Sequence, residues 1–142
     1  MKYPQTYSEE IEKKIVNIKK YGCCAFTTLW ALGKDTLSND EAIQLLIKGL
    51  DIGALDKDCT VNWKSFSKLI TNENYDVEMI DLLNQTKDEL KNYQGRIIVR
   101  FDNGNNYHWV GYENGKLVFN SLNYSYCVEY GRPTKIRILK KI

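Results

Sequence analysis

The first apolar pattern of the chain has the period of an α-helix. Ile11, Ile15 and Ile18 recur at i, i+4 and i+7, with lysines between them. Ser8 and the two glutamates after it are typical of a helix start, because they pair with the first N–H groups and complement the helix dipole. This spacing predicts an amphipathic helix that ends near residues 21–22.

A second helix is expected directly afterwards, and it is apolar on nearly every side. Residues 23–32 read Cys, Cys, Ala, Phe, Thr, Thr, Leu, Trp, Ala and Leu, a composition typical of a helix buried in the centre of a domain. Gly33 follows at the position where a left-handed residue commonly ends a helix. We therefore expect two helices that meet at Gly22.

Capping signals mark further helices in the middle of the chain. Residues 38–41 have the sequence of a capping box and precede apolar residues at helical spacing within 43–50. Residues 63–70 carry a short amphipathic pattern. Residues 86–89 repeat the capping box and predict a brief helix through Tyr93.

The second half of the chain changes to the composition of β-strands. Asn114 and Gly115 form the strongest short signal for a hairpin turn. The expected strands are 96–101, 107–112, 116–119 and 135–140, with a turn-forming segment at 102–106. Helices followed by an antiparallel sheet indicate an α+β fold. We expect one domain over 1–142, with a helical part of about 1–94 and a sheet part of about 95–142.

Length and charge exclude several classes of function. The 142 residues fit one domain with a core large enough to fold without disulfides or metal. Twenty Lys and Arg and eighteen Asp and Glu are mixed along the sequence, so we expect neither a nucleic-acid nor a membrane partner. The chain begins without an apolar signal segment and has no apolar run of about 18 residues, the length of a membrane span. A cytoplasmic protein is therefore expected.

One histidine and four cysteines limit the metal chemistry. A single histidine, His108, excludes a histidine-rich zinc site, and the cysteines form no C-x-x-C pair. We therefore expect neither a metal nor an organic cofactor. The cysteines are expected to be free thiols in a reducing compartment, although their even number also allows two disulfides. Cys24 is expected to fill the core of its helix rather than to act as a resolving thiol.

Three residues could together carry nucleophilic catalysis. Cys23 opens the apolar helix, where the helix dipole favours a thiolate. His108 lies on a strand, and Asn120 follows the second strand of the hairpin, so paired strands can place the two side chains together. A cysteine nucleophile needs a base, and the base needs an orienting group. The alternative is a small buried cysteine, an incidental histidine and a turn asparagine.

Three blocks around these residues resemble the papain-like cysteine peptidases. Residues 21–27 read Tyr-Gly-Cys-Cys-Ala-Phe-Thr, where the family has Gly-Ser-Cys-Trp-Ala-Phe-Ser. His108 precedes Val-Gly-Tyr at residues 110–112, and residues 120–122 read Asn-Ser-Leu where the family has Asn-Ser-Trp. In length the chain is similar to compact bacterial and phage members, such as bacteriocin-leader peptidases. Residues 35–94 carry no pattern of the family, so the substrate cleft stays unassigned.

The resemblance implies a fold and a site. N-terminal helices, with a central nucleophile helix, would pack on a C-terminal antiparallel sheet. Cys23 would be the nucleophile, His108 the base and Asn120 the residue that orients the base. Asn17, six residues before Cys23, takes the position of the oxyanion-hole glutamine. No cofactor or metal takes part in this chemistry.

The implied function is cleavage of a peptide, isopeptide or other amide bond in a peptide or protein substrate. One alternative is a binding or inhibitory module of phage or mobile-element origin with little turnover. The short side chain of Asn17 and Leu122 in place of the family's tryptophan favour this alternative. A second alternative is a peptidoglycan amidase or endopeptidase acting on cell-wall peptide. Acyl transfer by the same three residues also stays open.

Overall fold

The computed structural model describes residues 9–122 and 125–142, so Ser8, the expected first cap, lies outside the described residues. The helices are α1 (Glu9–Tyr21), α2 (Cys23–Ala31), α3 (Asn39–Asp51), α4 (Trp63–Thr71), the 3₁₀-helix η1 (Lys87–Asn92) and α5 (Tyr126–Tyr130). The strands are β1 (Tyr75–Asp81), β2 (Arg96–Asn103), β3 (Asn106–Glu113), β4 (Lys116–Phe119) and β5 (Arg132–Lys141).

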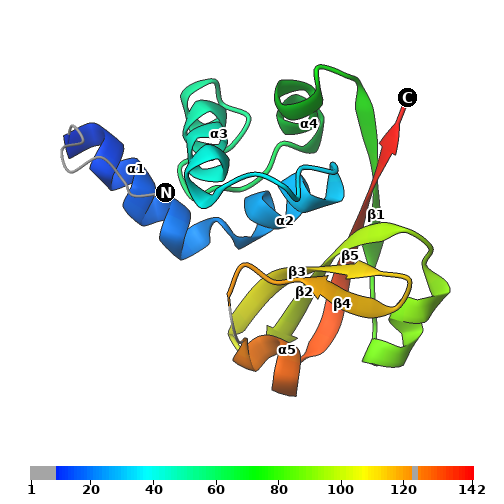
Figure 1. Cartoon of the computed structure of the whole chain (residues 1–142). Coiled ribbons are helices and arrows are strands. Elements are labelled where there is room, and N and C mark those ends of the chain that lie inside the picture. The colour runs from blue at the N-terminus through cyan, green and yellow to red at the C-terminus, as the bar shows by residue number, and fades with distance from the viewer. Residues whose placement is uncertain (1–8, 123–124) are drawn as a thin grey trace.

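The five strands form one antiparallel sheet in the order β1-β5-β2-β3-β4. Figure 1 shows α1 to α4 on one side of this sheet and α5 on the other. Helices and an antiparallel sheet confirm the expected α+β class. None of the described helices is long and apolar enough to cross a membrane.

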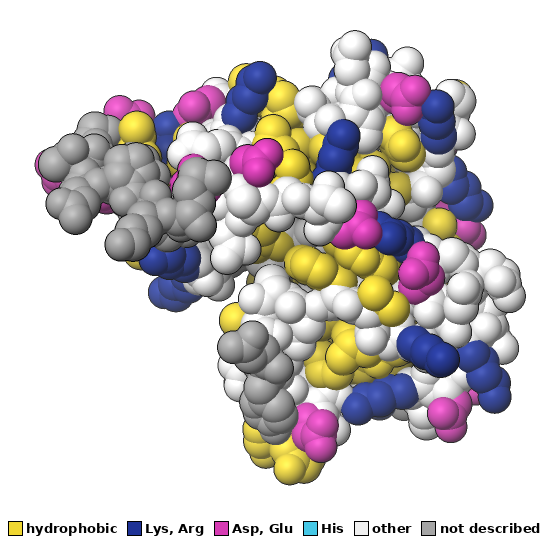
Figure 2. All heavy atoms as spheres, in the orientation of Figure 1, with side chains coloured by type: hydrophobic (Ala, Val, Ile, Leu, Met, Phe, Trp, Pro, Cys, Tyr) yellow, Lys and Arg dark blue, Asp and Glu magenta, His cyan; other side chains and the backbone are white. Residues whose placement is uncertain are grey.

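Each face of the sheet has its own apolar core. On the side of α1 to α4, Ala25 and Phe66 are fully buried among the helices. On the opposite side, Leu90 of η1 and Val128 of α5 pack in one cluster with Phe101. On the outer surface, basic and acidic side chains are interspersed over the face drawn in Figure 2. The sheet is therefore the shared wall between two cores.

Gly22 joins α1 to α2 where no side chain fits. Its N–H donates to the carbonyl of Ile18 at 2.8 Å. A Cβ at position 22 would lie 2.4 Å from that oxygen. The two helices therefore meet at Gly22 as expected, and Cys23 is the first residue of α2.

Other local signals of the sequence are also confirmed. Ser38 Oγ accepts from the N–H of Glu41 at 3.1 Å, and the Glu41 carboxylate accepts from the N–H of Ser38 at 3.3 Å. This capping box begins α3. Gly33 is left-handed (φ 83°), and so are Asn114 (φ 51°) and Gly115 (φ 81°), which turn β3 into β4. Short-range chemistry thus determines these boundaries.

The boundary expected near residues 94 and 95 is wrong, because β1 belongs to the sheet. β1 pairs with β5 from Tyr75 opposite Lys141 to Asp81 opposite Lys135. It is an edge strand, and most of its side chains are half-buried or exposed. Tyr75, Val77 and Met79 alternate with acidic residues, a strand pattern that the sequence analysis did not use.

Two short elements also differ from expectation. The segment after Thr86 is the 3₁₀-helix η1, and the Thr86 side chain makes no capping hydrogen bond. The helix α5 has only five residues, too few to show a helical period, and the sequence analysis does not predict it. It buries Cys127 and Val128 on the face of the sheet opposite α2.

Candidate functional site

The N-terminal turn of α2 lies along the free edge of β3. β4 pairs only with residues 111–113 of β3, which leaves the main chain of Trp109 beyond the end of that pairing. Thr27 Oγ1 donates to the carbonyl of Trp109 at 3.3 Å. The N–H of Trp109 points to the sulfur of Cys23. These contacts cover the sheet edge and bring Cys23 to the residue next to His108.

Cys23 is half-buried and keeps its thiol protonated at neutral pH. Burial raises the pKa of Cys23 above its ordinary value, and the N–H groups of Trp109, Cys24 and Cys23 act in the opposite direction. The expected preference for the thiolate at the helix N-terminus is not met, because desolvation outweighs these N–H groups. To act as a nucleophile, this thiol would need a base.

His108 and Asn120 meet as the hairpin predicts. His108 Nε2 lies 2.7 Å from Asn120 Oδ1, which also accepts from the N–H of Leu122 at 3.0 Å. An amide oxygen only accepts, so the Nε2 atom of His108 carries the proton. The Nδ1 atom keeps a lone pair and can act as a base.

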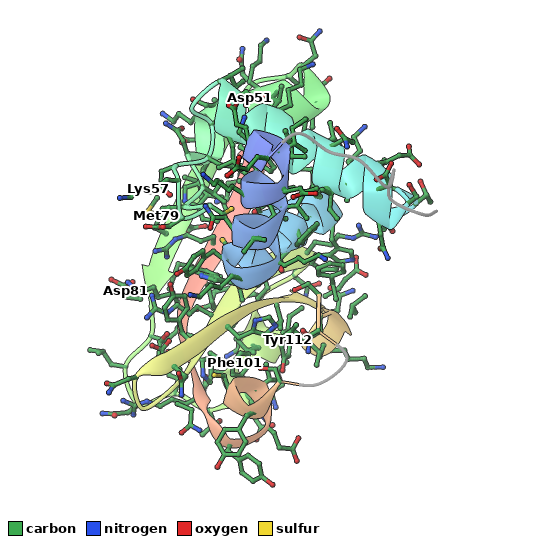
Figure 3. The ribbon with its side chains drawn as sticks, turned by 90° about the vertical axis from the view of Figure 1, so that its left-hand side faces the viewer. Asp51, Lys57, Met79, Asp81, Phe101 and Tyr112 are labelled. Atoms are coloured by element: carbon green, nitrogen blue, oxygen red, sulfur yellow. The ribbon has the colours of Figure 1, made fainter. Side chains whose placement is uncertain are left out.

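The His108 ring is buried on the side of the sheet that faces α5. Neighbouring residues of a strand point to opposite faces, and Trp109 packs against the helical core. His108 is paired in register with Phe101, which belongs to the opposite core together with Tyr112. Figure 3 shows Phe101 and Tyr112 between the sheet and α5. Burial lowers the pKa of His108, while the hydrogen bond to Asn120 acts the other way.

The structure thus brings His108 and Asn120 into contact and places Cys23 nearby. Among the described residues no hydrogen bond links Cys23 to His108. The sulfur of Cys23 instead faces the peptide N–H that follows His108. Since this nitrogen is bonded to the carbonyl carbon of His108, the Cys23 sulfur lies against the main chain next to His108.

Asn17 does not take the expected oxyanion position. Its amide donates to the carbonyl of Lys57 at 3.4 Å, so α1 directs this side chain to the loop after α3. It does not line the cleft beside Cys23. The break at Gly22 separates the axis of α1 from that of α2, which the spacing of six residues does not reveal.

A cleft of about 450 Å³ opens beside Cys23. Its walls come from α2, α4 and the strands β2, β3 and β5; they include Trp63, Arg100, Tyr107, Trp109 and Arg137. Trp63 and Trp109 meet edge to face, with ring centres 6.4 Å apart. The sequence analysis does not assign these residues to a site, because strand register alone brings them together.

The described residues contain no group of three His, Cys, Asp or Glu side chains that could hold a metal ion. All four cysteines are free thiols in the structure. Cys24 is buried in the helical core, where it was expected.

Comparisons with known proteins found no matching family model, no matching curated protein and no matching solved structure. The functional interpretation therefore rests on geometry and chemistry.

Proposed function

We propose that this chain is a papain-like cysteine hydrolase that cleaves a peptide, isopeptide or other amide bond. One observation carries the proposal. The first turn of α2 holds Cys23 against the main chain next to His108, whose Nε2 is bound by Asn120. The order of Cys23, His108 and Asn120 along the chain is that of the papain-like family, which supports the proposal.

His108 has to turn toward Cys23 when a substrate enters the cleft. The sulfur faces the peptide nitrogen after His108 at the edge of β3 that β4 does not pair with, so the ring has to turn around this edge from the α5 side. Catalytic hydrogen bonds are often loose without substrate and tighten in the complex. Asn120 can follow the ring, because it lies beyond the end of β4.

The reaction proceeds in two steps. The Nδ1 atom of His108 takes the thiol proton while Cys23 sulfur bonds to the substrate carbonyl carbon. The C–N bond then breaks, and the imidazolium gives its proton to the leaving amine. Water, deprotonated by His108, attacks the thioester and releases a carboxylic acid and the thiol. The N–H groups of Cys23 and Cys24 act on the sulfur, and we assign them as donors to the oxyanion.

Cleavage of a complex peptide mixture tests the proposal. Mass spectrometry should find new peptide termini with the wild type and none with Cys23→Ala. His108→Ala should lower the rate by about 10²–10⁴-fold, the usual contribution of acid–base catalysis. Met79→Ala, an exposed sulfur-containing residue on β1 outside the cleft, is the control and should retain cleavage. Equal products from Cys23→Ala and the wild type would contradict the proposal.

A second candidate is a binding module with little turnover. It is favoured by the missing Cys23–His108 hydrogen bond, the protonated thiol and the engagement of Asn17 with Lys57. A stable complex with a peptide or protein, formed equally by the wild type and Cys23→Ala without cleaved product, would support it. Digestion of purified peptidoglycan in the same series separates a cell-wall amidase from a peptidase.

A further inference from the structure

The cleft beside Cys23 contains a guanidinium group without an anionic partner. Arg137 lies on β5, next to Ile136, which is buried in the core on the α5 side of the sheet. Alternation along the strand therefore directs Arg137 to the α2 side, where it lines the cleft. Its guanidinium lies 5.8 Å from the ring centre of Trp109.

Most of the hydrogen-bonding capacity of Arg137 is unused. Its Nη1 donates to the carbonyl of Ile136 at 3.0 Å, and a guanidinium has five N–H donors. No described carboxylate lies within ion-pair distance of it. The other cleft arginine differs, because Arg100 makes two bonds of 2.9 Å to the Asp102 carboxylate. Arg137 is thus a half-buried cation that the described chain leaves uncompensated.

Building on the proposed hydrolase, we infer that Arg137 is a specificity-determining residue that binds a carboxylate of the substrate. The guanidinium lies within cation–π distance of the Trp109 ring, and its planar fork is pre-organised, so little entropy is lost when a carboxylate forms paired bonds to it. A substrate anion also removes the cost of a half-buried charge without a partner. The substrate class is therefore a peptide with a carboxylate close to the bond to be cleaved, either on an acidic side chain or at its C-terminus.

Binding of labelled decapeptides to the Cys23→Ala protein tests this inference without turnover. One set is amidated and contains a single Glu, the second is amidated with Gln at that position, and the third carries Gln with a free C-terminal carboxylate. Fluorescence anisotropy should show one carboxylate set binding about tenfold or more tighter than the neutral set. Whichever set binds tighter identifies the source of the carboxylate.

Two variants of Arg137 and a control assign the effect. Arg137→Gln in the Cys23→Ala background should reduce the preference to less than about twofold. Arg137→Lys keeps the charge but not the planar fork, and should lower the preference for carboxylate peptides severalfold. Arg132→Gln changes the same charge on the same strand but outside this cleft, and should leave the preference intact.

The inference is overturned if the Cys23→Ala protein shows no preference for carboxylates, or if that preference survives in both Arg137 variants. Thermal unfolding of each variant verifies that it is folded. The readout is separate from the hydrolase test, because it needs no cleavage. A protein that selects carboxylates but leaves peptides intact would contradict the hydrolase and retain this role of Arg137.

Discussion

At the scale of single residues, the site is held in a neutral resting state. Burial raises the pKa of Cys23 and lowers the pKa of His108, so a thiol faces the main chain next to an uncharged imidazole. Both shifts favour the neutral thiol and imidazole over a thiolate–imidazolium pair. The proton must move during attack, and the Nδ1 lone pair of His108 is the acceptor that the bond to Asn120 leaves available.

The titration of His108 is a direct measure of this arrangement. The chain has one histidine, so its imidazole signals in an NMR pH titration need no assignment. The midpoint should lie below the ordinary value of about 6.5. Asn120→Ala should lower it further, because the hydrogen bond to Asn120 raises this pKa. A midpoint that rises in Asn120→Ala would contradict the arrangement.

The same shift has a consequence for stability. The unfolded chain binds the proton of His108 more readily than the folded chain, because the folded pKa is lower. His108 therefore costs no stability above about pH 6.5, and lowers the free energy of unfolding as the pH falls from there toward the folded pKa.

Sequence alone could identify His108 and its partner Asn120. The sequence could not predict that the His108 ring is buried on the α5 side, because a shift of one position along a strand moves a side chain to the opposite face of the sheet.

At the scale of elements, the contact of α2 with β3 positions Cys23. Gly111 of β3 supports the Trp30 ring, and a Cβ at position 111 would lie 2.4 Å from that ring. The boundaries of α2 and α3 could be predicted from Gly22, Gly33 and the capping box, whose chemistry is local. The strand β1 also carries a local signal, because apolar residues alternate with acidic ones over 75–79, whereas the five-residue helix α5 is too short to show a period.

Gly111→Ala should separate α2 from β3. Trp30 is 4% exposed and has little room to move, so we expect a loss of about 1–3 kcal/mol in the free energy of unfolding. Alkylation of Cys23 by iodoacetamide should become faster as α2 loosens. Gly53→Ala is the control, because its φ of 79° strains an alanine while nothing lies within 4 Å of the new Cβ. Urea unfolding and mass spectrometry of the alkylated protein measure the two effects, and unchanged alkylation in Gly111→Ala would count against the contact.

At the scale of the whole molecule, the order of strands builds the cleft. β5 enters the sheet between β1 and β2, which places Arg137 on the same face as Arg100 and Trp109. The α+β class follows from helices that precede strands along the sequence. The position of β5 in the sheet does not follow from the sequence, because it depends on long-range pairing that no local pattern encodes. The cleft could therefore not be predicted from the sequence, whereas Cys23 and its helix could.

Because both cores share the sheet, the molecule should unfold as one unit. All three tryptophans lie on the α2 side, with Trp30 in α2, Trp63 in α4 and Trp109 in contact with Trp63. Leu90 is fully buried in the opposite core. Leu90→Ala should lower the free energy of unfolding by about 2–5 kcal/mol through the cavity that it leaves.

The reporter for this prediction is on the other side of the sheet. Tryptophan fluorescence reports on the helical core, and near-ultraviolet tyrosine signals report also on the core around Tyr112. In urea, both signals of Leu90→Ala should shift to the same lower midpoint, because strands β2, β3 and β5 contribute side chains to both faces. A fluorescence transition that keeps the wild-type midpoint while the tyrosine signal shifts would mean that the helical core folds alone. Cys23 would then keep its helix but lose the strand that brings it to His108.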